Sequence, residues 1–210
     1  MNRASKLLTH LAVLALSASP NFAQSSEPGG SSKTVATQMA LRDLWVDHVF
    51  WVRNVVLAAA QKDKKAQDIA EKQVVENAKQ IAASIEPFYG KAANEKLFGL
   101  LAGHYGAIKD YLNATIPKPN EKLQKAAVDR LTANAQEIAS FLSGANPNLP
   151  KGTLIALLSA HGGHHVAQIN EIQKKNFAGE AETWGGMKHH MYAIADALAG
   201  AIAKQFPEKF

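Results

Sequence analysis

Apolar residues recur at helical spacing along most of this 210-residue chain, and no stretch alternates between apolar and polar residues for long. Residues three and four apart share one face of a helix, so this spacing predicts helices that each bury one apolar stripe. Clusters of glycine and proline interrupt the pattern and separate its segments. The sequence therefore predicts an all-α protein, folded as a compact bundle of about six helices.

Helix boundaries follow from these interruptions. Proline disfavours helix at the residue before it, so Pro87 ends one helix and Pro117 ends the next. Gly185 and Gly186 mark a weak point inside the last helix. We expect helices at about 35–60, 65–85, 92–114, 120–142, 151–176 and 181–205.

The N-terminus has the pattern of a secretory signal. Arg3 and Lys6 precede a short apolar run at 7–18, which small residues follow. We expect a signal peptide at 1–23, a flexible lead-in at 24–34 that is rich in Ser, Gly and Pro, and a single helical-bundle domain at 35–210. The protein is then exported to the periplasm or beyond, and no segment of the mature chain reaches the roughly 20 apolar residues of a transmembrane helix.

Charge and cysteine content exclude several classes of function. The formal net charge is +5, but the lysines are spread among acidic residues, as on solvated helix faces. No nucleic-acid partner is expected from such a pattern. The chain has no cysteine, which excludes disulfides, thiolate metal sites and covalent c-type haem attachment. Composition leaves the oligomeric state open.

Two pairs of segments repeat at one offset. The segment at 77–82 resembles 134–139, and the segment at 100–106 resembles 157–163, each 57 residues apart. A constant offset across two helices and their connection predicts an internal duplication, in which the second and third helices match the fourth and fifth.

Histidines occupy four of the expected helices. Each of these helices has one histidine in register with its apolar stripe: His48, His104, His161 and His190. Helical bundles build metal and cofactor sites from inward side chains on facing helices. We therefore predict that these four histidines share one metal site.

Other polar residues near these positions receive supporting roles. His161 and His165 are four residues apart and share a helix face, but His165 is assigned a place beside the site, with His164, His189 and Asp47. Six glycines adjoin the histidines, and each mid-helix glycine costs about 1 kcal/mol relative to alanine. That cost indicates room for close helix contact or for a ligand. The six are Gly103, Gly106, Gly162, Gly163, Gly185 and Gly186.

Imidazole chemistry limits the ligand. Neutral imidazole binds zinc, copper, iron and nickel, and an all-nitrogen site favours copper or zinc. Iron, or haem held without covalent attachment, is a variant of the same hypothesis. The alternative is a metal-free structural or small-ligand-binding bundle, because a lone inward histidine is usually hydrogen-bonded in the core. Four histidines on four helices favour a shared site over four separate core residues.

An enzyme is the least favoured class. Catalysis by a metal-bound water needs an open coordination position and a general base, and no acidic residue has a suitable place. No catalytic residue is assigned. The spacing of His161 and His165 also occurs in hemerythrin-type oxygen carriers, but Ile108 and Ala195 stand where such a site requires carboxylates.

Several segments resemble an uncharacterised family of small bacterial exported helical-bundle proteins with four inward histidines. The matching segments lie at 44–48, 51–54, 85–90, 134–143, 145–150 and 204–210. The resemblance implies the bundle fold and the same four histidines, His48, His104, His161 and His190. Some relatives carry the labels glycosyltransferase or acetylglutamate kinase, but this sequence has no glycine-rich phosphate loop after a strand.

Overall fold

A computed structural model of the chain describes residues 32–210. The predicted signal peptide and most of the predicted lead-in lie outside the described residues. The first helix already begins at Ser32, so the last three residues of the predicted lead-in are helical.

Six long helices make up the fold, which confirms the predicted all-α bundle. A one-turn helix α3 (Glu86–Tyr89) and a terminal 3₁₀ turn η1 (Pro207–Lys209) accompany them, and residues 32–210 contain no strand. The long helices are α1 (Ser32–Gln61), α2 (Lys64–Ser84), α4 (Lys91–Thr115), α5 (Glu121–Ala145), α6 (Lys151–Gln173) and α7 (Phe177–Gln205).

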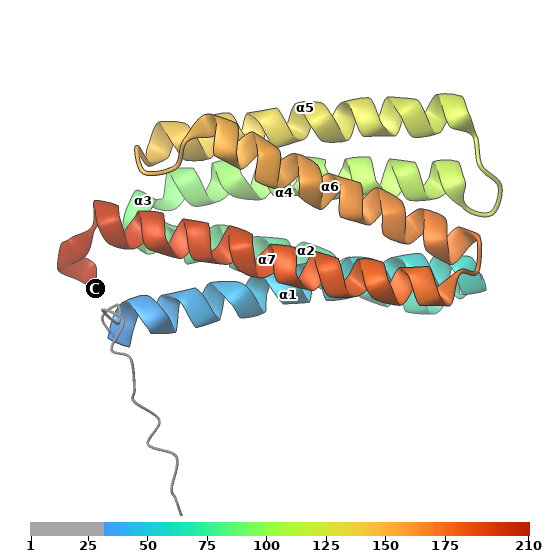
Figure 1. Cartoon of the computed structure of the whole chain (residues 1–210), viewed down its shortest axis with the longest axis horizontal. Coiled ribbons are helices and arrows are strands. Elements are labelled where there is room, and N and C mark those ends of the chain that lie inside the picture. Colours follow the sequence, from blue (N-terminus) through green and yellow to red (C-terminus); the bar gives the residue numbers. More distant parts are fainter. Residues whose placement is uncertain (1–31) are drawn as a thin grey trace, which may run out of the picture.

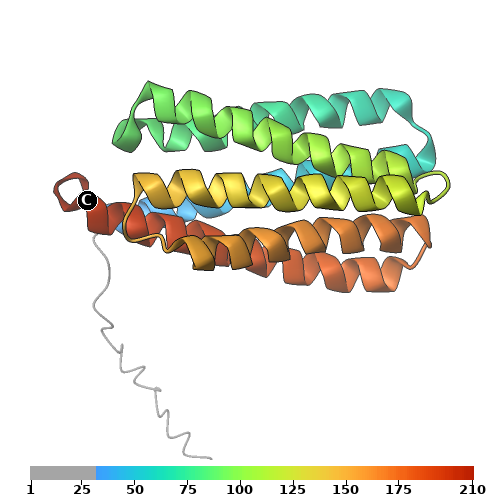
Figure 2. The same ribbon diagram turned by 90° about the horizontal axis from the view of Figure 1, so that it is seen from above.

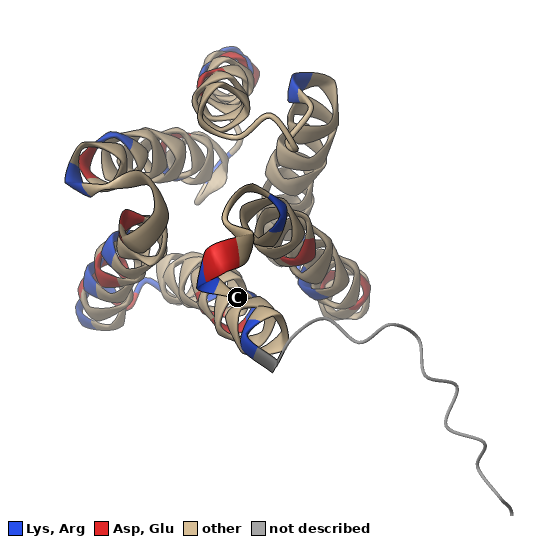
Figure 3. Cartoon of the chain, turned by 90° about the vertical axis from the view of Figure 1, so that its left-hand side faces the viewer, with Lys and Arg blue, Asp and Glu red and all other residues tan. Residues whose placement is uncertain are grey.

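The long helices form three antiparallel hairpins, α1–α2, α4–α5 and α6–α7 (Figures 1 and 2). Helix α2 packs beside α4, α5 beside α6, and α7 beside α1, so the hairpins close into a ring, seen end-on in Figure 3. Helix α6 also contacts α1 and α4 across the ring. The first helix of each hairpin therefore faces the interior. Figure 3 also shows that positively and negatively charged residues are interspersed along the helices in view.

The three hairpin turns use the same capping device. Asp63, Asn120 and Asn176 precede α2, α5 and α7, and each side chain accepts a hydrogen bond from the backbone N–H three residues later. Such caps satisfy backbone donors that the first helical turn leaves unpaired. Asn176 is therefore a cap and not the end of α6, and α7 begins four residues earlier than the sequence pattern predicts. Helix α7 continues through Gly185 and Gly186 without interruption.

The apolar core has two parts. One is built around Leu41, Trp45 and the leucines at the start of α4 and α6. The other contains Val52 and Ile108 and lies toward the far ends of α1, α4 and α6. The inward histidines fall between these parts in all three helices, so the fold places them near the middle of the bundle. Within residues 32–210, no helix combines the length and the apolarity that crossing a membrane requires.

Candidate metal centre

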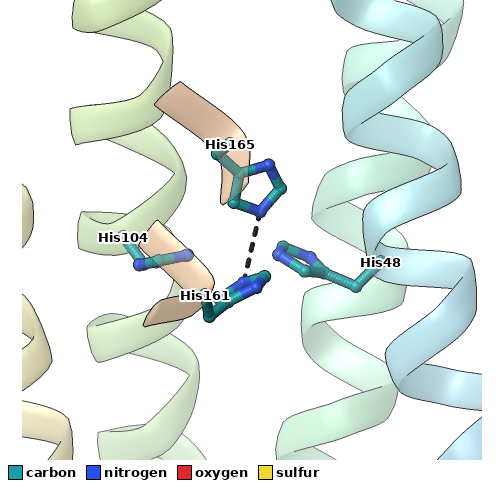
Figure 4. A group of neighbouring side chains, drawn as sticks. All are labelled: His48, His104, His161 and His165. Atoms are coloured by element: carbon teal, nitrogen blue, oxygen red, sulfur yellow. Dashed lines mark hydrogen bonds between the residues drawn. The ribbon is translucent and has the colours of Figure 1, made fainter. Parts of the chain in front are cut away.

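Four buried histidines from three helices converge between the two parts of the core (Figure 4). His48 comes from α1, His104 from α4, and both His161 and His165 come from α6. Each is at most 4% exposed. One ring nitrogen from each histidine can be chosen so that all four atoms lie within 4.8 Å of one another. This is the one group of three or more metal-binding side chains found among the described residues.

The rings surround a common point without stacking as a column. The ring-centre distances among the four histidines run from 4.5 Å, between His161 and His165, to 6.0 Å, between His104 and His165. Nε2 of His161 lies 3.2 Å from Nε2 of His165, a contact drawn as the dashed line in Figure 4. The spacing of four residues on α6 produces this contact, because it places the two side chains one helical turn apart on the same face.

Most of the ring nitrogens have no hydrogen-bond partner in the described part of the chain. Both nitrogens of His48 and of His104 are buried and unpaired, although the Asn134 carboxamide approaches His104. Nδ1 of His161 and Nδ1 of His165 are unpaired as well. Buried polar atoms are normally bonded, and leaving one unpaired costs about 1–3 kcal/mol. Six such atoms in one place are compatible with a bound ligand that pairs with some of them.

Burial keeps these imidazoles neutral. Desolvation lowers the pKa of His48 to about 3, with a smaller contribution from the neighbouring His104. Desolvation also lowers the pKa of His104 to about 4. The pKa values of His161 and His165 fall well below the usual range, first through burial and then through the other histidines. All four rings therefore present lone pairs at neutral pH, the form in which histidine binds metals.

The structure brings together three of the four predicted ligands, and His165 takes the place expected for His190. Nε2 of His190 instead donates a hydrogen bond to the carbonyl oxygen of Leu157, at 2.8 Å. His164 lies beside His190, with 5.4 Å between ring centres. His189 is exposed and stacks on Tyr192, and Asp47 is also exposed, so neither adjoins the group.

A repeated hydrogen bond explains the position of His190. Asn77 on α2 donates to the Leu44 carbonyl at 2.9 Å, and Asn134 on α5 donates to the Leu100 carbonyl at 3.0 Å. The acceptors Leu44, Leu100 and Leu157 each precede the inward histidine of their helix by four residues.

His190 is thus the third member of a series with Asn77 and Asn134, at offsets of 57 and 56 residues. Its function in this series is to join the two helices of a hairpin. The repeated units are the hairpins α1–α2, α4–α5 and α6–α7. The sequence repeat matched the same helices, α2 with α5 and α4 with α6, but grouped them as α2–α4 and α5–α6. A duplication of the sequence stays a prediction.

The signal that identifies His165 is present in the sequence. His161 and His165 share a helix face, so both enter the interior if either does. The prediction of one histidine from each of four helices gave this spacing too little weight.

The glycines beside the histidines mainly allow close helix contact. A Cβ atom on Gly162 would lie 2.9 Å from Cδ2 of Leu131 on α5, and one on Gly103 would lie 3.2 Å from Nδ2 of Asn134. No atom lies within 4 Å of a Cβ placed on Gly163 or Gly185. Gly162 and Gly103 therefore set the distance between α5 and the histidine-bearing helices.

A buried carboxylate, separate from the histidine group, is paired with an arginine. Glu180 on α7 is 3% exposed and accepts two hydrogen bonds from Arg53, at 2.6 and 2.8 Å. Gln168, on α6, donates a third hydrogen bond to it at 3.0 Å. The hydrogen bond from Arg53 is the main reason that the pKa of Glu180 is lowered. The sequence pattern did not identify this network, which ties α1, α6 and α7 together.

The arrangement can hold one cation through neutral nitrogen ligands, in a closed and mostly apolar environment. Comparison of the chain with known protein families, curated proteins and solved structures finds no match.

Proposed function

We propose that this protein binds one transition-metal ion, copper or zinc, through His48, His104, His161 and His165. The observation that carries the proposal is the set of buried, unpaired ring nitrogens that converge on one point. A bound ion would accept one lone pair from each of the four rings and so remove part of the cost of burying these nitrogens without partners.

The one short contact within the group suits a shared ion. Metal–nitrogen bonds of about 2.0–2.1 Å at a tetrahedral angle separate neighbouring nitrogens by roughly 3.3 Å. The two Nε2 atoms of His161 and His165 are 3.2 Å apart. Their positions on consecutive turns of α6 prepare two adjacent ligands before the metal arrives.

Buried charge favours monovalent copper among the candidates. The four ligands are neutral, and no carboxylate belongs to the group within the described residues. Cu⁺ would therefore leave a net charge of one in the core, whereas Zn²⁺ or Cu²⁺ would leave two. The cost of burying a charge rises steeply with its magnitude, so Cu⁺ is the best match for this environment.

The same geometry disfavours the other ligands considered. Four histidine rings with centres 4.5–6.0 Å apart already fill the space around this point, so a porphyrin does not fit between two of them. Iron sites commonly include carboxylates, and none belongs to this group among the described residues. Four ligands on one ion leave no obvious position for a reacting water, which argues for binding over catalysis.

Export of the protein is a separate part of the proposal, and it rests on the charged and apolar pattern at 1–23. N-terminal sequencing of the mature protein tests it. A chain that begins at or near Gln24 supports export, and a chain that retains residues 1–23 contradicts it.

Native mass spectrometry after chelator treatment tests the metal site. We expect one Cu⁺ per chain from an anaerobic Cu⁺ solution, and weaker binding of one Zn²⁺. His165→Ala should abolish tight binding, whereas its sequence neighbour His164→Ala should retain it, because only His165 belongs to the buried group. A wild-type protein that binds neither ion, or equal losses in the two variants, would show that the group is a metal-free part of the core.

A further inference from the structure

A pocket lies at the end of the bundle where α1, α4 and α6 end, the right-hand end in Figure 1. Its volume is about 600 Å³, within the range of small-molecule sites. The residues that line the pocket include Leu57, Leu112, Phe177, Lys62 and Lys175.

The pocket is separate from the histidine group. Leu57 follows His48 by nine residues on α1, or about 13 Å along the helix. Buried side chains that include Val52, Ile108 and Ile169 fill the intervening core. A ligand in the pocket would therefore not contact the histidines.

The lining of the pocket carries positive charge but no negative charge. Its walls are apolar, with Leu57, Leu112 and Phe177 among them, and its polar side chains are amides and two lysines. No acidic residue lines the pocket. Within residues 32–210, neither Lys62 nor Lys175 forms an ion pair with a carboxylate. Two positive charges thus adjoin an apolar surface without a protein counter-ion.

The backbone at both lysines is unusual. Lys62 and Lys175 have φ angles of 61° and 59°, and they are the only non-glycine residues with positive φ in the described chain. Each follows the last turn of a helix and closes it, through Lys62 N–H to Ala59 O and Lys175 N–H to Ile172 O. Glycine is the usual residue at such a position, because it adopts positive φ without a steric cost. The positive φ therefore does not require lysine at either position, although a cation is favourable at the C-terminal end of a helix.

We propose that this pocket binds a small organic anion with an apolar body, such as an aromatic or aliphatic carboxylate or sulfonate. The anionic group lies at the ammonium groups of Lys62 and Lys175, and the apolar body packs on Leu57, Leu112 and Phe177. The lysines also offset the partial negative charge at the C-terminal ends of α1, α4 and α6, which would otherwise repel an anion.

A matched pair of fluorescent probes tests the proposal. The anionic probe is 8-anilinonaphthalene-1-sulfonate, and the neutral probe is N-phenyl-1-naphthylamine, which has the same rings without the sulfonate. Titrated into the full-length protein, the sulfonate should bind at one site and at least about tenfold more tightly than the neutral probe. A tenfold difference is the size expected from about one favourable charge contact.

The decisive variant is the double substitution Lys62→Gly and Lys175→Gly. Glycine suits the backbone at both positions, so the melting temperature should stay the same or rise. The double variant should nevertheless lose at least about tenfold in affinity for the sulfonate and keep its affinity for the neutral probe. Phe177→Ala should weaken both probes, because it removes part of the apolar wall.

The control removes equal charge from the same end of the bundle. Lys118→Ala with Lys122→Ala changes two lysines that do not line the pocket, and it should leave both affinities within about twofold. Equal binding of the two probes by the wild type would overturn the proposal. Sulfonate affinity that survives the double glycine variant, or that falls equally in the control, would also overturn it.

Discussion

The two groups of histidines on α6 and its neighbours differ in what surrounds their nitrogens. In the central group, His48, His104, His161 and His165 are buried, and six of their eight ring nitrogens have no hydrogen-bond partner. In the outer pair, His190 is only partly buried, and its Nε2 is bonded to the Leu157 carbonyl. Both groups continue an apolar stripe, so register with the stripe does not distinguish them. The two groups differ in whether their ring nitrogens have hydrogen-bond partners.

The two groups also differ in how they connect the bundle. The central group joins the first helices of all three hairpins across the interior. His190 joins α7 to α6 within one hairpin, as Asn77 joins α2 to α1 and Asn134 joins α5 to α4. An ion in the central group would therefore stabilise the arrangement of hairpins, whereas loss of His190 affects one hairpin.

The largest expected difference between the two groups is in how they make the free energy of unfolding depend on pH. In the metal-free protein, the folded pKa values of His48 and His104 are about 3 and about 4, against about 6.5 in the unfolded chain. The unfolded state therefore takes up protons first as the pH falls. The contribution of these histidines to the stability of the folded state is therefore fully present above about pH 6.5. It is lost as the pH falls from there toward their folded pKa values.

Each central histidine contributes a loss of up to about 1.4 kcal/mol per pH unit, so the free energy of unfolding should fall by several kcal/mol between pH 7 and pH 5. Urea unfolding of chelator-treated protein at a series of pH values measures this. The double variant His164→Ala, His190→Ala should keep the dependence. A stability that stays constant down to pH 5 would contradict the burial of four neutral histidines.

Substitution by leucine should change the free energy of unfolding in opposite directions in the two groups. In metal-free protein at pH 7.5, His104→Leu should raise the free energy of unfolding by about 1–2 kcal/mol, because it replaces unpaired buried polar atoms with apolar ones. His190→Leu should lower it by about 1 kcal/mol, because the Leu157 carbonyl loses a donor. Urea titrations of the two variants give the comparison. Destabilisation of similar size in both would mean that the central histidines are structural.

The adjacent glycines on α6 offer a test of local packing between the two groups. Gly162→Ala should destabilise the protein by about 1–3 kcal/mol, because its Cβ would overlap Leu131. Gly163→Ala should stabilise it by up to about 1 kcal/mol, since its Cβ meets no atom within 4 Å and alanine favours helix. Thermal unfolding distinguishes the two signs. If both variants are destabilised, the space at Gly163 is needed for something other than helix contact.

The smallest expected effect concerns the equivalence of His190 with Asn77 and Asn134. His190→Ala should cost about 1 kcal/mol through the lost hydrogen bond. His190→Asn should cost less than half as much, because an asparagine makes the matching bond in the other two hairpins. Paired urea unfolding curves measure the difference. Equal costs would show that the three bonds are not interchangeable.

The sequence alone determined the fold class, the approximate helix boundaries and three members of the histidine group. Apolar spacing fixes which face of each helix is buried, and His48, His104 and His161 continue that face. Proline and glycine clusters locate the ends of the helices to within a few residues. The cap at Asn176 was missed because a single asparagine after two lysines is a weak signal beside the apolar pattern.

Only the tertiary structure showed that His190 lies outside the group. His165 and His190 both continue an apolar face, and the sequence cannot give the rotation of α7 about its axis relative to the other helices. That rotation is set by packing and by long-range polar contacts, such as those of Arg53 with Glu180 and of Arg42 with Asp196, which hold α7 against α1. These contacts join residues more than 120 positions apart. Helical periodicity gives the buried face of each helix, but which side chains meet across the core depends on how the faces are rotated and stacked.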